Sequence, residues 1–413
     1  MLSGINRQAN AYDSLYHGQT LALKVSGAEI ESPDFPKLAS DITSLNENGV
    51  NIALVFGGGE QINKKFGRPR PKVDGVAITN DDVLKNGVLP AYHDIRRKLS
   101  EALPHGILLD PNDLQCDFHP DSTYGLVGIP KNIVLPESKL VMTGFVGSVD
   151  GVSVNVNADD IARQLVEQYN DRIEELLFLT KAGGVLDTKG RVVSLLTEKR
   201  IDALLAGTDG GITVDEGMKK KMIEVRRALE KIAKVVITKT SGLQDEIEKW
   251  MGSGTLCVDS KQLTTSKMLY IEEPIFDAMY TTYVEQGIFR PRSPEELVKL
   301  KMHHQMLRAK HSPLGGLSLV PRGNWVELSG LWAGSIGNGI GQMLLESAVK
   351  EAGRRKMYAL SANPDSIGAF MASGLFRDVG PVSEAKAALP SDAPRELKMY
   401  DTSSRDPHVF MAV

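Results

Sequence analysis

The segment LVFGGGEQI is the strongest constraint on the fold. It joins an apolar run ending at Phe56 to three consecutive glycines, Gly57, Gly58 and Gly59, and then to a polar, helix-like stretch. A strand, a glycine run and a helix start gather backbone N–H groups at a helix N-terminus, which favours a bound anion such as phosphate. A plain tight turn is the alternative. No Gly-Lys-Ser/Thr follows, so the segment is not a Walker-type P-loop.

Short apolar segments alternate with amphipathic ones on both sides of these glycines. We expect a series of strands and helices: strands over 20–25, 51–56, 139–147, 174–180 and 235–238, and helices over 35–49, 158–170 and 215–234. The last helix carries one apolar stripe, formed by Met218, Met222, Val225, Leu229 and Ile232 at helical spacing. This alternation predicts an α/β fold with a mostly parallel sheet sandwiched by helices.

A new series of predicted helices and strands begins after about residue 260. We expect helices over 272–287, 293–309 and 341–355, a short helix near 364–373, and strands over 315–320, 325–333, 356–361 and 408–413. The chain is also too long for one ordinary domain. We therefore predict an N-terminal arm over 1–17, a first domain over 18–262 and a smaller α/β domain over 263–413.

Composition narrows the class of protein. Of the 413 residues, 42% are hydrophobic and 24% charged, as in soluble globular proteins, and the net charge of −4 argues against nucleic acid or an anionic membrane as partner. No apolar stretch reaches the length of a membrane span, and the first residues do not resemble a secretory signal. The two cysteines, Cys116 and Cys257, fit no metal spacing. These features favour a cytoplasmic protein without a metal site.

Polar residues near the first glycines fit phosphoryl transfer. Lys24 ends the first strand, Asn155, Asn157 and Asp159 stand at a helix entry, and Lys221 lies outside the apolar stripe. Phosphoryl transfer needs cations that neutralise the moving group, backbone donors that hold it and a carboxylate that orients the cations. Each residue also has a plainer reading: a solvated face for Lys221 and a favourable helix-start charge for Asp159.

Five segments in this region, LALKVSGAE, VFGGGEQI, NVNADDIARQL, LLFLTKAGGVLDTKGRVV and DEGMKKKMIEVRRAL, resemble the N-acetylglutamate kinase family in order. The resemblance implies the amino acid kinase fold and binding of ATP with Mg²⁺. It implies that Lys24 and Lys221 stabilise the phosphoryl group, that Asp159 orients them, that Gly57–Gly59 contact phosphate, and that Asn155 or Asn157 lies near an acyl-amino acid. The family's carboxylate-binding arginine is Ala77 here, and its second glycine after the lysine is Ser26.

A second glycine loop follows the strand at 325–333, with Gly334, Gly337, Gly339 and Gly341 before a helix. Backbone N–H groups there suit a pyrophosphate. A dinucleotide fold is one reading, but no acidic residue ends a later strand at the expected distance. The stretch resembles the acetyl-coenzyme A loop of Gcn5-related N-acetyltransferases (GNAT), which implies cofactor contacts from Leu331, Trp332, Gly337, Gly339, Ile340 and Gly341.

Three segments flank this loop in the second domain: VEQGIFRPRSPEELVKL, KMYALSANPDSIGAFMASGLF and DPHVFMAV. They resemble segments of bacterial N-acetylglutamate synthases, in which an amino-acid-kinase-like domain precedes a GNAT domain. The resemblance implies that Arg290 or Arg292 binds a substrate carboxylate. The synthases carry an arginine where this chain reads SANPD, and Ile336 replaces a basic or Gln residue of the loop.

Acetyl transfer needs a base for the amine proton. Glu327 and Tyr358 are the candidates, although Tyr358 also reads as a half-buried strand aromatic. Because adjacent histidines on a helix face opposite ways, we expect packing or surface roles rather than metal binding for His303, His304 and His311.

Three hypotheses remain. The first is an acetyl-coenzyme-A-dependent amino acid N-acetyltransferase of the N-acetylglutamate synthase type, with glutamate as acceptor, arginine as allosteric ligand and kinase activity retained beside it. The second is an amino acid kinase with a partnering or degenerate acetyltransferase domain. The third is a non-catalytic sensor. The resemblance also implies homo-oligomers that assemble through the kinase-like domain.

Overall fold

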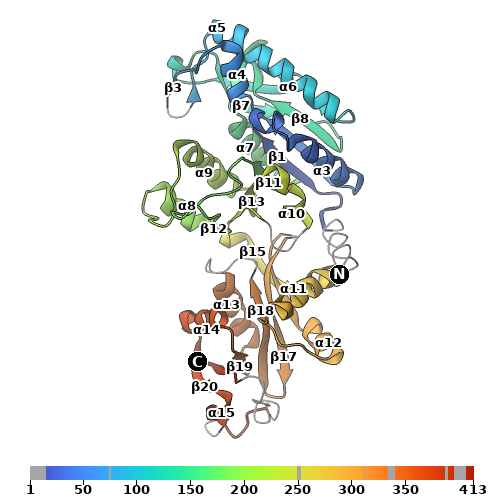
Figure 1. The fold of residues 1–413 in the computed structure, drawn as a ribbon, viewed down its shortest axis with the longest axis vertical. Coiled ribbons are helices and arrows are strands. Elements are labelled where there is room, and N and C mark those ends of the chain that lie inside the picture. The colour runs from blue at the N-terminus through green and yellow to red at the C-terminus, as the bar shows by residue number, and fades with distance from the viewer. Residues whose placement is uncertain are drawn as a thin grey trace. The chain divides into compact units, whose positions relative to one another are not determined.

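The computed structural model describes residues 15–73, 76–248, 253–310, 312–333, 340–386, 389–394 and 406–413 (Figure 1). The chain divides after Gln262 into two compact units, which we call the first unit and the second unit. No helix in the described ranges is long and apolar enough to cross a membrane.

An eight-stranded sheet forms the centre of the first unit. Its order is β12 (Leu195–Thr197), β14 (Thr255–Val258), β13 (Lys234–Thr238), β11 (Ile173–Leu179), β1 (Thr20–Val25), β2 (Asn51–Phe56), β8 (Leu140–Gly144) and β5 (Ile107–Leu108). All neighbours pair in parallel except β13 with β14. The near-continuous burial of β1, β2 and β11 explains their apolar sequences, because helices cover both faces of such sheets.

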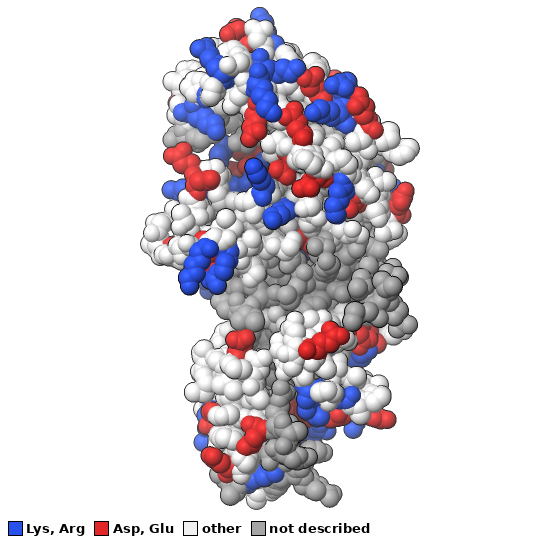
Figure 2. Space-filling model, in the orientation of Figure 1, with Lys and Arg blue, Asp and Glu red and all other residues white. Residues whose placement is uncertain are grey.

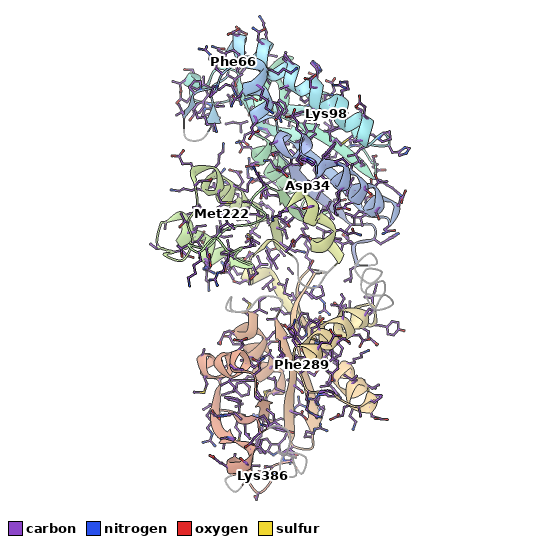
Figure 3. All side chains as sticks on the ribbon, in the orientation of Figure 1. Asp34, Phe66, Lys98, Met222, Phe289 and Lys386 are labelled. Carbon is purple, nitrogen blue, oxygen red and sulfur yellow. The ribbon has the colours of Figure 1, made fainter. Side chains whose placement is uncertain are left out.

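The helices of the first unit include α3 (Phe35–Glu47), α4 (Gly59–Phe66), α6 (Leu89–Ala102), α7 (Ala158–Gln168), α8 (Glu198–Leu205), α9 (Glu216–Ala228) and α10 (Leu243–Glu248). Met222 of the α9 stripe, labelled in Figure 3, packs into one core with Ile161 and Leu165 of α7 and with Val55 of β2. This packing fixes α7 and α9 side by side.

A small closed barrel, absent from our sequence prediction, also belongs to the first unit. It consists of β6 (Leu114–Phe118), β7 (Val127–Ile133), β9 (Val146–Val149) and β10 (Val152–Val156), and β10 leads directly into α7. A two-stranded hairpin, β3 (Lys72–Val73) with β4 (Val76–Ala77), follows α4.

The second unit is built on a seven-stranded sheet. Its order is β15 (Leu263–Lys267), β16 (His304–Ala309), β17 (Ser312–Arg322), β18 (Trp325–Ala333), β19 (Lys356–Ser361), β21 (His408–Ala412) and β20 (Phe376–Pro381). Only β18 and β19 pair in parallel. Its described helices are α11 (Glu273–Glu285), α12 (Pro294–Met302), α13 (Ile340–Ala352), α14 (Pro364–Ser373) and the short α15 (Val382–Ala385).

The predicted helix over 293–309 is wrong in its second half. Ser293 caps α12 through a reciprocal bond with Glu296, but the helix ends at Met302 and His304–Ala309 is the strand β16. Tertiary contacts outweigh helix propensity there: His304 Nε2 accepts a 3.0 Å bond from Trp332, and its Nδ1 lies 2.8 Å from Ser318 Oγ. Burial, with a contribution from the nearby Arg308, lowers the pKa of His304 to about 3, so this histidine is a neutral packing residue.

The predicted arm over 1–17 is described only from Leu15. Leu15 and Tyr16 are buried, and the Tyr16 hydroxyl donates a 3.0 Å bond to Glu175 of β11. Both residues therefore belong to the core of the first unit. Tyr16 also contacts Lys234, which lies 2.9 Å from Glu175, so its hydroxyl gives this buried ion pair the hydrogen-bond partner that buried polar groups require.

Candidate functional site

Asp159 holds two lysines in the first unit. Its Oδ1 lies 2.6 Å from Lys24 Nζ, and its Oδ2 lies 3.0 Å from Lys221 Nζ. Lys24 comes from β1, Asp159 from the first turn of α7, and Lys221 from α9, where its ammonium also lies 4.5 Å from the centre of the Phe178 ring. Residues 135 and 62 positions from Asp159 in the chain thus meet as one buried cluster.

Charge coupling sets the protonation of this cluster. Burial alone would raise the pKa of Asp159, but Lys221 and Lys24 outweigh it, and the pKa lies well below its usual range. Burial, with the charge of Lys24 adding and that of Asp159 opposing, lowers the pKa of Lys221 to about 8. At neutral pH the cluster therefore has two cations around one carboxylate, which favours an anionic ligand.

A cavity of about 320 Å³ opens beside this cluster. Its lining includes Lys24, Gly57–Gly59, Asn155 and Asn157. Asn157 caps α7 by accepting a 2.9 Å bond from the Asp159 N–H, and Asn155 Nδ2 donates a 3.0 Å bond to Thr79. These lining residues are all the site residues that the sequence indicated in the first unit except Asp159 and Lys221. Asp159 forms an ion pair with Lys24, and Lys221 lies close to Lys24 on the other side of the same carboxylate.

The three glycines have different neighbours. A Cβ at Gly58 would lie 2.3 Å from the Phe145 ring, whereas a Cβ at Gly59 would meet nothing within 4 Å and one at Gly57 would contact Ala158 at 3.4 Å. The close approach at Gly58 is therefore made by an aromatic ring of the chain itself. Gly59, at the start of α4, is the position with open space for a ligand.

In the second unit, β18 and β19 separate partway along their length. They pair from Trp325–Lys356 to Leu328–Ala359, and then the ladder stops, although β18 runs on to Ala333. The backbone of β18 beyond Leu328 has no partner in β19, which leaves polar groups available for an extended ligand. Leu331 and Trp332 lie in this part of β18.

The second glycine loop can be placed only in part. Gly334, Ile336, Gly337 and Gly339 lie outside the described residues. Ile340 and Gly341 begin α13, which packs on β17 and β18, and Ile340 is buried. The helix start predicted to follow the loop is thus present.

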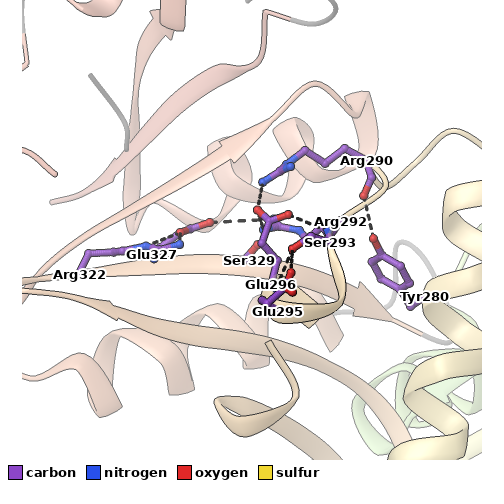
Figure 4. Close-up of polar contacts among 9 residues, drawn as sticks. All are labelled: Tyr280, Arg290, Arg292, Ser293, Glu295, Glu296, Arg322, Glu327 and Ser329. Atoms are coloured by element: carbon purple, nitrogen blue, oxygen red, sulfur yellow. Dashed lines mark hydrogen bonds and ion pairs between the residues drawn. The ribbon is translucent and has the colours of Figure 1, made fainter. Parts of the chain in front are cut away.

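A cavity of about 230 Å³ lies where β18 and β19 separate. Arg290 and Arg292, which the sequence indicated, line it together with Arg322 and the carboxylates Glu296 and Glu327. Figure 4 shows the three arginines and two glutamates connected: Arg290 lies 2.7 Å from Glu296, and Arg292 Nη2 donates a 2.6 Å bond to Ser329. Three cations and two carboxylates favour an acidic ligand. Phe289, labelled in Figure 3, adds an apolar wall.

The two predicted bases line the same cavity in different settings. Glu327 is nearly buried on β18, and Arg322 donates two bonds to its Oε2, at 2.9 and 2.7 Å (Figure 4). Tyr358 is also buried, on β19, with its ring 6.2 Å from the Trp325 ring. Its apolar surroundings agree with the packing role, and it also lines the cavity.

Sequence reasoning missed Arg322, Ser329, Glu296 and Tyr280, and, in the first unit, Arg70. β17 and β18 form a hairpin in which Arg322 pairs with Trp325 and Glu327 with Val320. Arg322 and Glu327 are therefore diagonal neighbours, and only the strand register brings their side chains within bonding distance. Ser361 and Asn363 of the SANPD region also line the second-unit cavity, where Arg322 supplies a cation that this segment lacks.

These folds define the class of protein: an amino acid kinase fold followed by a GNAT acetyltransferase fold. The whole chain shares its fold with N-acetylglutamate synthase of Neisseria gonorrhoeae, solved with coenzyme A and L-arginine. The TM-score is 0.67, the identity 19%, and the match covers 100% of this chain and 99% of that one.

In sequence the chain is similar to acetylglutamate kinase of Xanthomonas campestris pv. campestris, at 27% identity over 271 residues, which cover 61% of this chain and 62% of that protein. It is also similar to amino-acid acetyltransferase of Pasteurella multocida, at 27% identity over 224 residues, covering 48% and 50%. The chain therefore spans less than two thirds of the length of either relative. No family model matches it.

Proposed function

We propose that the second unit transfers an acetyl group from acetyl-coenzyme A to the α-amino group of an acidic amino acid, with L-glutamate as acceptor. The observation that carries this proposal is the separation of β18 from β19 directly beside the arginine-rich cavity. The fold shared along the whole chain with N-acetylglutamate synthase, and the similarity to an amino-acid acetyltransferase, support it.

Different residues of the second unit would bind the cofactor and the acceptor. The unpaired edge of β18 around Leu331 and Trp332 would hold the pantetheine arm, and the start of α13 at Ile340 and Gly341 would lie near its phosphates. Arg290 and Arg292 would bind the carboxylates of the acceptor.

Glu327 would accept the proton of the attacking amine. The amine nitrogen bonds to the thioester carbonyl carbon, the carbon–sulfur bond breaks, and coenzyme A leaves as the thiol after it receives a proton. Arg322 would orient the Glu327 carboxylate through its two bonds to Oε2, which leaves Oε1 turned toward the cavity.

The test uses acetyl-coenzyme A labelled in the acetyl group, with L-glutamate and a panel of other amino acids as acceptors. We expect labelled N-acetylglutamate by mass spectrometry, and a strong loss in Arg292→Met. The control is Arg377→Met, an exposed arginine of β20 that does not line the cavity. A labelled product from another amino acid alone would keep the chemistry and change the acceptor. No product with any acceptor would contradict the proposal.

The first unit supports a second candidate, phosphoryl transfer from ATP with Mg²⁺ to a carboxylate. The specific observation is that Asp159 contacts both Lys24 and Lys221, next to the open Gly59 backbone. The lysines would neutralise the transferred group, and Asp159 would orient them. Trapping an acyl phosphate with hydroxylamine, with N-acetyl-L-glutamate as substrate, tests this activity; no trapped product would leave the first unit as a binding domain.

The remaining expectations concern assembly and location. We propose arginine as an allosteric ligand, assembly through the first unit and a cytoplasmic location. Two buried, free cysteines, Cys116 and Cys257, support a reducing compartment. Interspersed acidic and basic side chains on the face of the first unit seen in Figure 2 favour small ligands over nucleic acid.

A further inference from the structure

The first-unit cavity contains a buried guanidinium with an unused donor. Arg70 is 9% exposed and lines this cavity, and its Nη1 has no hydrogen-bond partner among the described residues. No described carboxylate lies within ion-pair distance of it. A buried charge without a partner destabilises the folded chain, so its presence calls for an explanation.

The side chain is held in place from one side. Its Nε donates a 3.1 Å bond to Asn63 Oδ1, on the helix that begins at the glycines. The remaining guanidinium nitrogens are then oriented relative to the start of α4. Burial lowers the pKa of Arg70 from its very high ordinary value, and the group stays charged at neutral pH.

The cavity around Arg70 is cationic. Lys24, Arg70 and Lys72 line it, whereas the exposed Glu60 is the only carboxylate among the described residues of the lining. Ala77, paired with Lys72 across the β3–β4 hairpin, contributes no charge. A ligand with one anionic group near Lys24 and Gly59 would still need a partner for Arg70, and a volume of about 320 Å³ suits a molecule of amino acid size.

We propose that Arg70 binds a carboxylate of a small acid in this cavity, and so selects ligands of the first unit by that carboxylate. A guanidinium fork matches a carboxylate better than an ammonium does. The ligand supplies the hydrogen-bond acceptors that Nη1 lacks in the chain. Binding requires no turnover, so the inference holds whether or not the first unit transfers phosphate. Only the choice of probe rests on the proposed acetyl transfer.

The test is calorimetric titration of the full chain with N-acetyl-L-glutamate, the product of that proposed reaction, and with its two monoamides. Arg70→Met should weaken binding of the diacid about 10- to 100-fold. The native protein should bind one of the two monoamides as weakly as Arg70→Met binds the diacid. Arg70→Met should bind that monoamide and the diacid with equal affinity. Arg70→Lys should recover only part of the loss.

Controls separate binding from folding and from the second unit. Arg68→Met, at an exposed arginine two residues away whose guanidinium lies 5.2 Å from the Phe66 ring, should leave the affinity unchanged. The melting temperature of Arg70→Met should not fall below that of the native chain, because Met removes a buried charge that has no ionic partner among the described residues. Coenzyme A release measured on the same samples reports the second unit independently.

Three outcomes would overturn the proposal. They are equal loss of affinity for the diacid and both monoamides, a lowered melting temperature with unchanged affinity, and no saturable binding of N-acetyl-L-glutamate by the native chain.

Discussion

Arg322 directs two hydrogen bonds, from Nε at 2.9 Å and Nη2 at 2.7 Å, at a single carboxylate oxygen of Glu327. The other oxygen, Oε1, lies 4.0 Å from Arg292 in the wall of the cavity. The pair comes from adjacent strands of one hairpin, so the carboxylate has one fixed orientation. We propose that its less engaged oxygen accepts the amine proton during acetyl transfer.

Replacing Glu327 by Gln should lower kcat about 100-fold or more, because proton transfer by a positioned base contributes about 100- to 10,000-fold. Initial rates of coenzyme A release at saturating substrates measure this effect. Glu346→Gln, at an exposed position of α13, is the matched control. Full activity in Glu327→Gln would move the base elsewhere, with Tyr358→Phe as the next variant.

Replacing Asp159 by Asn should destabilise the first unit by about 3 kcal/mol, because it leaves two buried ammonium groups without their carboxylate. Hydrogen exchange of the β1 and α7 amides measures this locally. Asp171→Asn, at an exposed turn after α7, should change the same amides by less than about 0.5 kcal/mol. Equal protection in the two variants would mean that the ion pairs add nothing to stability.

The pKa of Lys221, about 8, predicts how the first unit responds to alkali. The ammonium loses its proton as pH rises through 8, so ATP-dependent phosphoryl transfer should decline above that pH. Lys221→Arg should keep its charge and shift the decline to higher pH. An identical profile in both proteins would show that Lys221 does not set it.

The lowered pKa of Lys221 should make the free energy of unfolding rise with pH, whereas it makes phosphoryl transfer decline. Between pH 8 and the ordinary lysine value of 10.5, the unfolded chain binds more protons than the folded one. The contribution of Lys221 to stability therefore rises with pH across this window. A melting temperature that falls more steeply in the native protein than in Lys221→Arg would contradict this sign.

The glycine run gives a prediction that separates its members. Gly58→Ala should cost about 1–3 kcal/mol, because its Cβ would lie 2.3 Å from the Phe145 ring. Gly59→Ala should leave stability within about 0.5 kcal/mol, because its Cβ meets open space, yet it should weaken binding of anionic ligands there. Denaturation and titration of both variants test the distinction. Equal destabilisation would mean that the backbone, not Phe145, requires both glycines.

Much of the fold was predictable because its signals are local. The segments 20–25, 51–56 and 356–361 are strands with those same bounds, and 364–373 is a helix. Each strand is a mostly apolar segment, and the helix carries a clear cap at Asn363. HQMLRA failed as a helix because its buried neighbours, Trp332 and Ser318, lie on other strands. The barrel was missed in part because the single strand predicted over 139–147 is divided between two sheets: β8 ends at Gly144 in the large sheet, and β9 begins at Val146 in the barrel.

Site residues that stand in a recognisable sequence motif were predictable. Residues that join the site only through tertiary contacts were not. Lys24 was indicated by its place at the end of a strand, Asp159 by its place at a helix entry and Lys221 by its place outside an apolar stripe, and the structure brings the three together. Arg322 and Arg70 stand in unremarkable sequence. Only the register of a hairpin and the burial of one guanidinium distinguish them from surface arginines.

The most direct test of the central claim is coenzyme A release from acetyl-coenzyme A by the full chain, followed with a thiol reagent and L-glutamate as acceptor. The account predicts release that saturates with glutamate and falls in Arg292→Met and Glu327→Gln, but not in Arg377→Met. No release above background with glutamate, or with any amino acid of the panel, would contradict it.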